Sequence, residues 1–219
     1  MNGMSMAWMR MPGQTWPEAA AMFVGMWDAM MVAMMLPSLV PMLSRYRKAA
    51  GGGPGLTALA AAGYFFVWTL VGMAAFPPGA ALAALEMQEP RLARAVPFAA
   101  AAVVVLAGVL QLTAWKARQL DCCRETPGPL PANARTAWRH GVRLGLACIR
   151  CCAGPTAVLL AIGVMDLRAM AVVTAAITAE RLTPAGARVA QMSGVAAVGA
   201  GLFMMAHTSP LIDLIGRFR

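Results

Sequence analysis

Three cysteines within five residues form the group in this chain best suited to bind a metal. Cys148, Cys151 and Cys152 make a C-x-x-C-C pattern inside an apolar segment. On a helix, Cys148 lies one turn from both other cysteines, so the three sulfurs share one face. Thiolates grouped in this way suit zinc or cuprous copper, and Arg150 in the same segment favours the thiolate form. The alternative is that the three pack as small apolar side chains.

The other two cysteines, Cys122 and Cys123, are adjacent and lie in the polar stretch that precedes this segment. Adjacent cysteines rarely hold a metal alone, but they can complete a site that the C-x-x-C-C pattern begins. Five cysteines do not form an even disulfide framework, and all five lie on or near the side expected to be cytoplasmic and reducing. We therefore expect metal binding or transient redox chemistry here rather than structural disulfides.

Methionines recur every four residues in the apolar segment 19–43, so on a helix they return to nearly the same face. They are Met22, Met26, Met30 and Met34, and Met31 and Met35 widen the stripe. Thioethers bind cuprous copper and do not form disulfides. Methionine also packs well between helices. The stripe is therefore either a ladder of soft ligands or part of a core.

Charged residues in apolar segments give a third set of candidates. Asp28 lies within the methionine stripe, and a carboxylate inside a bilayer is costly and usually faces a bundle interior or a cavity. Arg150 is a candidate partner for it. Glu180 and Arg181 are expected to mark a membrane boundary, with Glu180 turned inward as the alternative. His207, near the end of the last apolar segment, either caps a soft-metal site or is solvated.

Composition places the chain in a membrane. Hydrophobic residues make up 60% of it and charged residues 12%, with a mean hydropathy of +0.65. The net charge of +9 comes from basic residues beside apolar segments, which indicates membrane orientation rather than binding to nucleic acid. No phosphate loop, dinucleotide pattern or H-E-x-x-H motif is present. We expect a binding protein rather than an enzyme, in contact with lipid and with a protein partner or a second copy of itself.

The apolar segments predict an all-α fold, a polytopic transmembrane helical bundle of six spans. The spans are expected at residues 19–43, 56–76, 96–114, 144–165, 168–182 and 189–206. Together they form a transmembrane domain, 19–208, between a methionine-rich extracytoplasmic tail, 1–18, and an amphipathic tail, 209–219. Pro37 and Pro41 are expected to kink or end the first span. Pro77 and Pro78 are expected to end the second, before a loop at 80–95.

The fifth span has an alternative. Residues 169–179 are apolar but short, so they could form a re-entrant segment that enters and leaves the membrane on the same side. The chain would then have five spans. With six spans and the N-terminus outside, eleven basic residues are cytoplasmic and six are outside. The eleven are Arg45, Arg47, Lys48, Lys116, Arg118, Arg124, Arg135, Arg139, Arg143, Arg181 and Arg188, and the six are Arg10, Arg91, Arg94, Arg168, Arg217 and Arg219. An excess of cytoplasmic basic residues favours this orientation over its inverse. The five-span alternative also divides them eleven to six, so charge does not decide between the two.

Several stretches resemble a bacterial family of predicted metal-binding integral membrane proteins, the domain of unknown function 2182. The matching stretches are residues 27–38 (WDAMMVAMMLPS), 111–127, 145–152 (GLACIRCC) and 163–170, together with Glu180 and Arg181. The chain departs from that pattern at Gln119, where the family tends to have a cysteine, and at Arg150, where it favours glycine. The resemblance implies an inner-membrane protein that binds a metal.

We therefore expect a protein of the bacterial inner membrane that binds a soft metal, cuprous copper before zinc. It would serve metal uptake, delivery or the assembly of a metalloenzyme. Three alternatives stay open: a membrane thiol–disulfide oxidoreductase, a non-catalytic subunit of a larger complex, and a transporter of another solute with Asp28 in its path.

Overall fold

The computed structural model is entirely helical over the residues it describes, which are 8, 10, 13–51, 53–124, 131–163 and 166–208, without the side chains of 90–94 and 122–124. The helices in chain order are α1 (Trp16–Ala50), α2 (Pro54–Gln88), α3 (Pro90–Gln111), α4 (Ala114–Arg124), α5 (Ala134–Ile162), α6 (Leu167–Leu182) and α7 (Gly186–Thr208). The predicted all-α fold is confirmed. Of the expected N-terminal tail, 1–18, residues 1–7, 9, 11 and 12 lie outside the described residues, and its last three residues belong to α1. The expected C-terminal tail, 209–219, lies wholly outside them.

Four helices, α1, α2, α5 and α7, are long and apolar enough to cross a membrane. A fifth candidate is a broken one, in which Ala95–Gln111 of α3 and Ala114–Asp121 of α4 meet at an angle of 65°. Helix α6 has 16 residues, fewer than an unaided crossing usually requires. These helices are compatible with a membrane protein, but length and composition do not confirm six spans.

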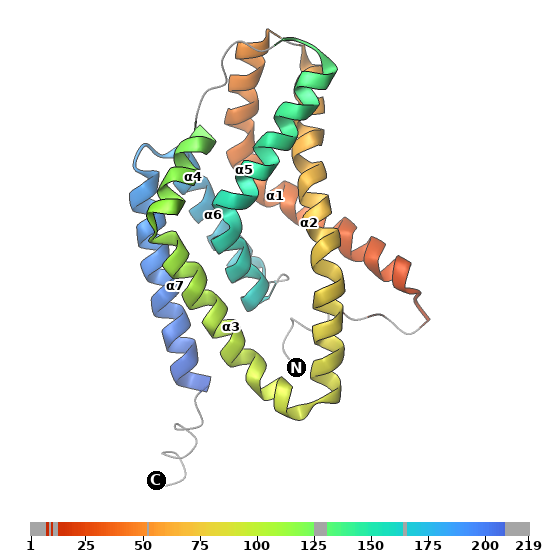
Figure 1. Ribbon diagram of the computed structural model, residues 1–219, viewed down its shortest axis with the longest axis vertical. Helices are drawn as coiled ribbons and strands as arrows, with labels where there is room; N and C mark the ends of the chain where they lie inside the picture. The colour runs from red at the N-terminus through yellow and green to blue at the C-terminus, as the bar shows by residue number, and fades with distance from the viewer. Residues whose placement is uncertain are drawn as a thin grey trace.

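Helices α1, α2, α3, α5, α6 and α7 run in alternating directions along the long axis of the molecule, and α4 continues in the general direction of α3 (Figure 1). The end of α1 and the beginnings of α2 and α5 lie at one end of the bundle, and the α2–α3 connection lies at the other (Figure 1). The most extensive contacts between helices are those of α3 with α7, α2 with α5, and α1 with α2. Helix α5 thus lies inside the bundle, where α2 and α3 pack against it.

Prolines end neither of the first two helices, so the prediction that α2 ends at Pro77 and Pro78 was wrong. Helix α2 continues to Gln88, and α3 begins at Pro90, which leaves no loop at 80–95. Helix α1 runs through Pro37 and Pro41 to Ala50, and its ribbon changes direction part-way along (Figure 1). A proline removes one helical hydrogen bond, but packing against neighbouring helices can keep the helix intact on both sides of it.

Glycines bring α2 and α5 into close backbone contact. A side chain at Gly141 would collide with the backbone of Ala60, and one at Gly63 would lie 2.7 Å from the carbonyl of Trp138. A side chain at Gly145 would lie 3.0 Å from the carbonyl of Tyr64. Since Gly145 lies one turn before the cysteine cluster, this contact sets the distance between that cluster and α2.

Helix α6 is held at its start by Asp166. The carboxylate accepts hydrogen bonds from the backbone N–H groups of Arg168 and Ala169, at 2.8 and 3.0 Å. These bonds satisfy N–H groups that have no partner within the helix. They lower the pKa of Asp166, with the bond from Ala169 contributing most. This cap positions the helix whose last turn carries Glu180 and Arg181.

Candidate metal centre

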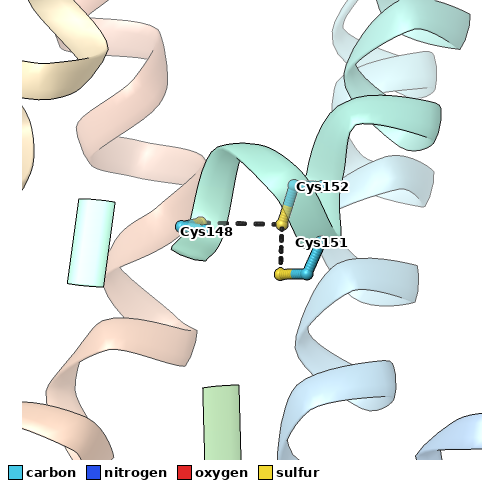
Figure 2. A group of neighbouring side chains, drawn as sticks. All are labelled: Cys148, Cys151 and Cys152. Carbon is cyan, nitrogen blue, oxygen red and sulfur yellow. Dashed lines mark hydrogen bonds between the residues drawn. The ribbon is translucent and has the colours of Figure 1, made fainter. Parts of the chain in front are cut away.

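The three sulfurs of the C-x-x-C-C pattern converge in the core. Cys148, Cys151 and Cys152 are at most 1% exposed, and all three Sγ atoms lie within 4.8 Å of one another. The Sγ atom of Cys152 is 3.6 Å from that of Cys148 and 3.5 Å from that of Cys151 (Figure 2). These separations exclude a disulfide bond, in which the sulfurs are about 2 Å apart. The predicted convergence on one helix face is confirmed.

This spacing suits a single metal ion. With a metal–sulfur distance of about 2.3 Å, three sulfurs arranged around one ion are about 4 Å apart. The separations of 3.5 and 3.6 Å and the upper limit of 4.8 Å bracket that value, so small side-chain rotations would suffice for binding. The donors are soft, which favours copper or zinc over harder ions.

Cys148 lies where four helices meet. Its sulfur accepts a hydrogen bond from the Tyr64 hydroxyl of α2 at 2.9 Å and one from the Arg181 guanidinium of α6 at 3.2 Å. The Sδ atom of Met35 on α1 lies 3.9 Å away. A thiol, a thioether and a fixed positive charge are therefore grouped around the first cysteine.

Arg181 connects the cysteine cluster to α1. Besides Cys148, its guanidinium donates to the Ser38 hydroxyl at 3.0 Å and to the Met42 sulfur at 3.1 Å. The side chain is only 4% exposed. A buried cation beside thiols favours their deprotonated, metal-binding form. Sequence reasoning placed Arg181 at a membrane boundary and did not connect it with the cysteines.

Arg150 does not have the role predicted for it. Its side chain is exposed on α5, and its Nε atom donates to the carbonyl of Leu146 at 3.2 Å. The charge that supports the thiolates comes from Arg181 instead. Arg150 is also not the partner of Asp28, whose carboxylate accepts a hydrogen bond from the Thr69 hydroxyl at 3.0 Å. The helical phase of α5 explains the error, because the three cysteines are buried in the core whereas residue 150 reaches the exposed side of the helix.

The methionine stripe lies in the core and touches the cluster. Met30, Met31, Met34 and Met35 are at most 7% exposed, Met26 is partly buried, and Met22 is 60% exposed. Burial of this kind is typical of a helical core, and it also places the thioethers where a desolvated soft metal would be held. The contact of the stripe with Cys148 through Met35 links thioethers and thiols in one continuous set of soft donors.

A buried ion pair lies on the other side of the cluster. Lys116 Nζ is 2.7 Å from Glu180 Oε2, and both side chains are at most 3% exposed. The other carboxylate oxygen accepts from Gln111 and Ser193, each at 2.7 Å. Lys116 also donates to the backbone carbonyl of Cys151. Glu180 thus turns inward, which was the alternative that the sequence left open for it.

Of the remaining candidates, His207 lies apart from the cluster, and the side chains of Cys122 and Cys123 are not described. His207 is exposed at the end of α7, where its ring lies 4.3 Å from that of Phe203. The backbones of Cys122 and Cys123 belong to α4, but their side chains lie outside the described part of the chain. Their part in a metal site stays a prediction.

Residues 24–204 match the family model described as "PpoB2: Copper chaperone". Because the match covers most of the chain, the chain belongs to this copper chaperone family. Comparison with curated proteins and with solved structures gave no match. The family and the buried cluster of three cysteines agree in pointing to copper as the metal.

Proposed function

We propose that this chain is an integral membrane copper chaperone that holds cuprous copper between Cys148, Cys151 and Cys152. The observation that carries the proposal is the buried group of three thiols within 4.8 Å of one another. Copper fits better than zinc because the thioether of Met35 lies 3.9 Å from the Cys148 sulfur, and thioethers select cuprous copper. The cargo is then passed on for uptake, delivery or assembly of a copper enzyme.

A thiol–disulfide oxidoreductase is less well supported by the same geometry. In an enzyme of that kind a cysteine thiolate attacks a disulfide of the substrate, and a mixed disulfide between the two proteins forms as the intermediate. All three cysteines are at most 1% exposed, so a protein substrate has no direct access to them. Burial at this depth suits the retention of a small ion.

We place the chain in the bacterial inner membrane with six crossings and both ends outside the cytoplasm. The alternating directions of the helices support six crossings, with α3 and α4 as one broken crossing and α6 as a short one (Figure 1). A short crossing is physically possible because α6 packs against α1, α5 and α7. The excess of basic residues on one side supports the orientation.

A topology experiment tests this arrangement. A reporter fused after residue 219 is expected to be extracytoplasmic, whereas one inserted at residues 127–135 is expected to be cytoplasmic, because six crossings return the chain to the side where it began. Paired reporters that are active on opposite sides of the membrane provide the measurement. A C-terminal reporter on the cytoplasmic side would instead support five crossings with α6 re-entrant.

The methionine stripe is proposed as the route by which copper moves to or from the cysteines. Replacing Met30, Met34 and Met35 by leucine keeps the buried volume nearly unchanged, so packing alone predicts little change in stability. We expect the variant to lose about tenfold or more in the rate of copper transfer, since leucine offers no ligand. Transfer of cuprous copper to a chelator, followed by absorbance, measures the rate.

The matched control removes the same number of thioethers from exposed positions outside the stripe, by leucine at Met73, Met87 and Met192. It is expected to transfer copper as the unmodified protein does. Thermal unfolding of both variants separates a packing defect from a ligand defect. If the buried triple variant transfers copper at the normal rate, the stripe is core packing and the proposed route is wrong.

A further inference from the structure

A small cavity connects the cysteine cluster with the surface. Its volume is about 160 Å³, and Cys151, Lys116, Arg150, Trp115 and Leu110 are among the residues that line it. Trp115 and Leu110 are 41% and 48% exposed, and Arg150 is exposed too, so the cavity opens outward. Cys151 lies at its inner end, since that side chain is only 1% exposed. The cavity therefore offers a path to an otherwise buried cluster.

The opening of this cavity is positively charged. Lys116 and Arg150 are its two basic residues, and the charge of Lys116 is balanced by Glu180 at 2.7 Å. Arg150 is different, because its hydrogen bond goes to the neutral carbonyl of Leu146 and no described carboxylate pairs with it. A free cuprous cation approaching by this path would be repelled, whereas an anion would be attracted.

We propose that this cavity admits copper as an anionic complex, in which the cuprous ion is bound by small anionic ligands, and that Arg150 draws the complex in. This inference rests on the proposed function of the cysteine cluster. A volume of about 160 Å³ equals that of about five water molecules in the liquid, which is enough for an ion with one or two small ligands. The substrate of the chaperone at this opening is then the complex rather than the bare ion.

The transfer to Cys151 is a ligand exchange without oxidation or reduction. A bond forms between the Cys151 sulfur and copper, and one bond between copper and its incoming ligand breaks. The thiol proton passes to the solvent, and the displaced ligand leaves as a free anion. A second ligand stays on copper until the sulfur of Cys148 or Cys152 displaces it in the same way, so each copper–sulfur bond formed releases one proton and one anion. Binding of copper by thiols is coupled to proton release in this way.

The experiment compares two forms of cuprous copper on the same protein. Purified, reduced protein is mixed rapidly with anionic dichlorocuprate or with the cationic acetonitrile complex of cuprous copper. Both mixtures have the same ionic strength, which is set with chloride for the first complex and with perchlorate for the second. Growth of the thiolate-to-copper absorption gives the two loading rates. The quantity compared is their ratio, because differences in the amount of folded protein cancel in it.

Arg150→Gln is expected to lower the ratio of anionic to cationic loading about tenfold, and Arg150→Glu is expected to lower it further. Arg143→Gln is the matched control, since it removes the same charge from an exposed position on α5 two turns earlier. Its ratio is expected to equal that of the unmodified protein. An unchanged ratio in both Arg150 variants would overturn the inference.

The proposed function can fail separately from this inference. If the unmodified protein binds no copper from either complex, the cysteine cluster is not a copper site and the proposed function is wrong. If copper binds but its loading ratio does not depend on residue 150, only the route through the cavity is wrong.

Discussion

Replacing Cys148, Cys151 and Cys152 together by serine is expected to abolish tight binding of cuprous copper. Serine keeps the size of the side chain but offers a hard oxygen donor in place of a soft sulfur. Changes in the partners that merely orient metal ligands cost about 10- to 100-fold in affinity, so the loss of all three ligands should exceed about 1000-fold. Competition with a cuprous chelator of known affinity, under reducing conditions, measures the change.

The pH dependence of the unmodified protein provides a second check on the same site. Copper displaces protons from the thiols, so the apparent affinity is expected to fall as pH is lowered and to rise as pH increases. The serine triple variant should lose this dependence together with the tight site. Tight binding that persists in the triple variant would place the copper elsewhere.

The control for the cysteine experiment is the pair Cys122 and Cys123. If the three buried cysteines suffice, replacing this pair by serine should leave tight binding in place. If tight binding is lost in that variant as well, the pair completes the site, as the sequence suggested. Either result distinguishes a site within α5 from one shared between α4 and α5.

The second large effect is expected from the buried ion pair. Glu180→Gln removes the charge that balances Lys116 but leaves an amide able to bond with Gln111 and Ser193. Breaking a buried pair by changing one partner costs about 3–5 kcal/mol, because it leaves an uncompensated charge. We therefore expect a large fall in the unfolding temperature of the protein in detergent.

The double variant Lys116→Met with Glu180→Gln tests this explanation. Removing both charges can be nearly neutral for stability, so the double variant is expected to recover most of what the single change loses. Thermal unfolding of the unmodified protein, both single variants and the double variant completes a mutant cycle. A double variant no more stable than the less stable single one would show that the charge imbalance is not the cause.

The ion pair also has a consequence for the metal site. Lys116 donates to the backbone carbonyl of Cys151, so it holds the segment that carries two of the three cysteines. The next residue after Glu180 is Arg181, which bonds to Cys148. The last turn of α6 thus contacts both ends of the C-x-x-C-C pattern, through Lys116 at one end and directly at the other.

Local patterns in the sequence were enough to predict the helical class and the convergence of the three sulfurs. Both depend on short-range geometry, since apolar segments of this length form helices and residues three or four apart share a helix face. The soft chemistry of cysteine and methionine likewise follows from residue type, and it agrees with the copper chaperone family to which the chain belongs. The helical class, the convergence of the three sulfurs and the softness of the donors therefore do not depend on which helices pack against α5.

The surroundings of the cluster were decided by tertiary structure alone. Tyr64 lies 84 residues before Cys148, Met35 lies 113 residues before it and Arg181 lies 33 residues after it, so no local spacing connects them. The choice of Arg181 over Arg150 as the cation beside the thiols depends on which face of α5 turns inward. Close contact with α2 at Gly141 and Gly145 fixes that rotation, because only glycine leaves room for the facing backbone.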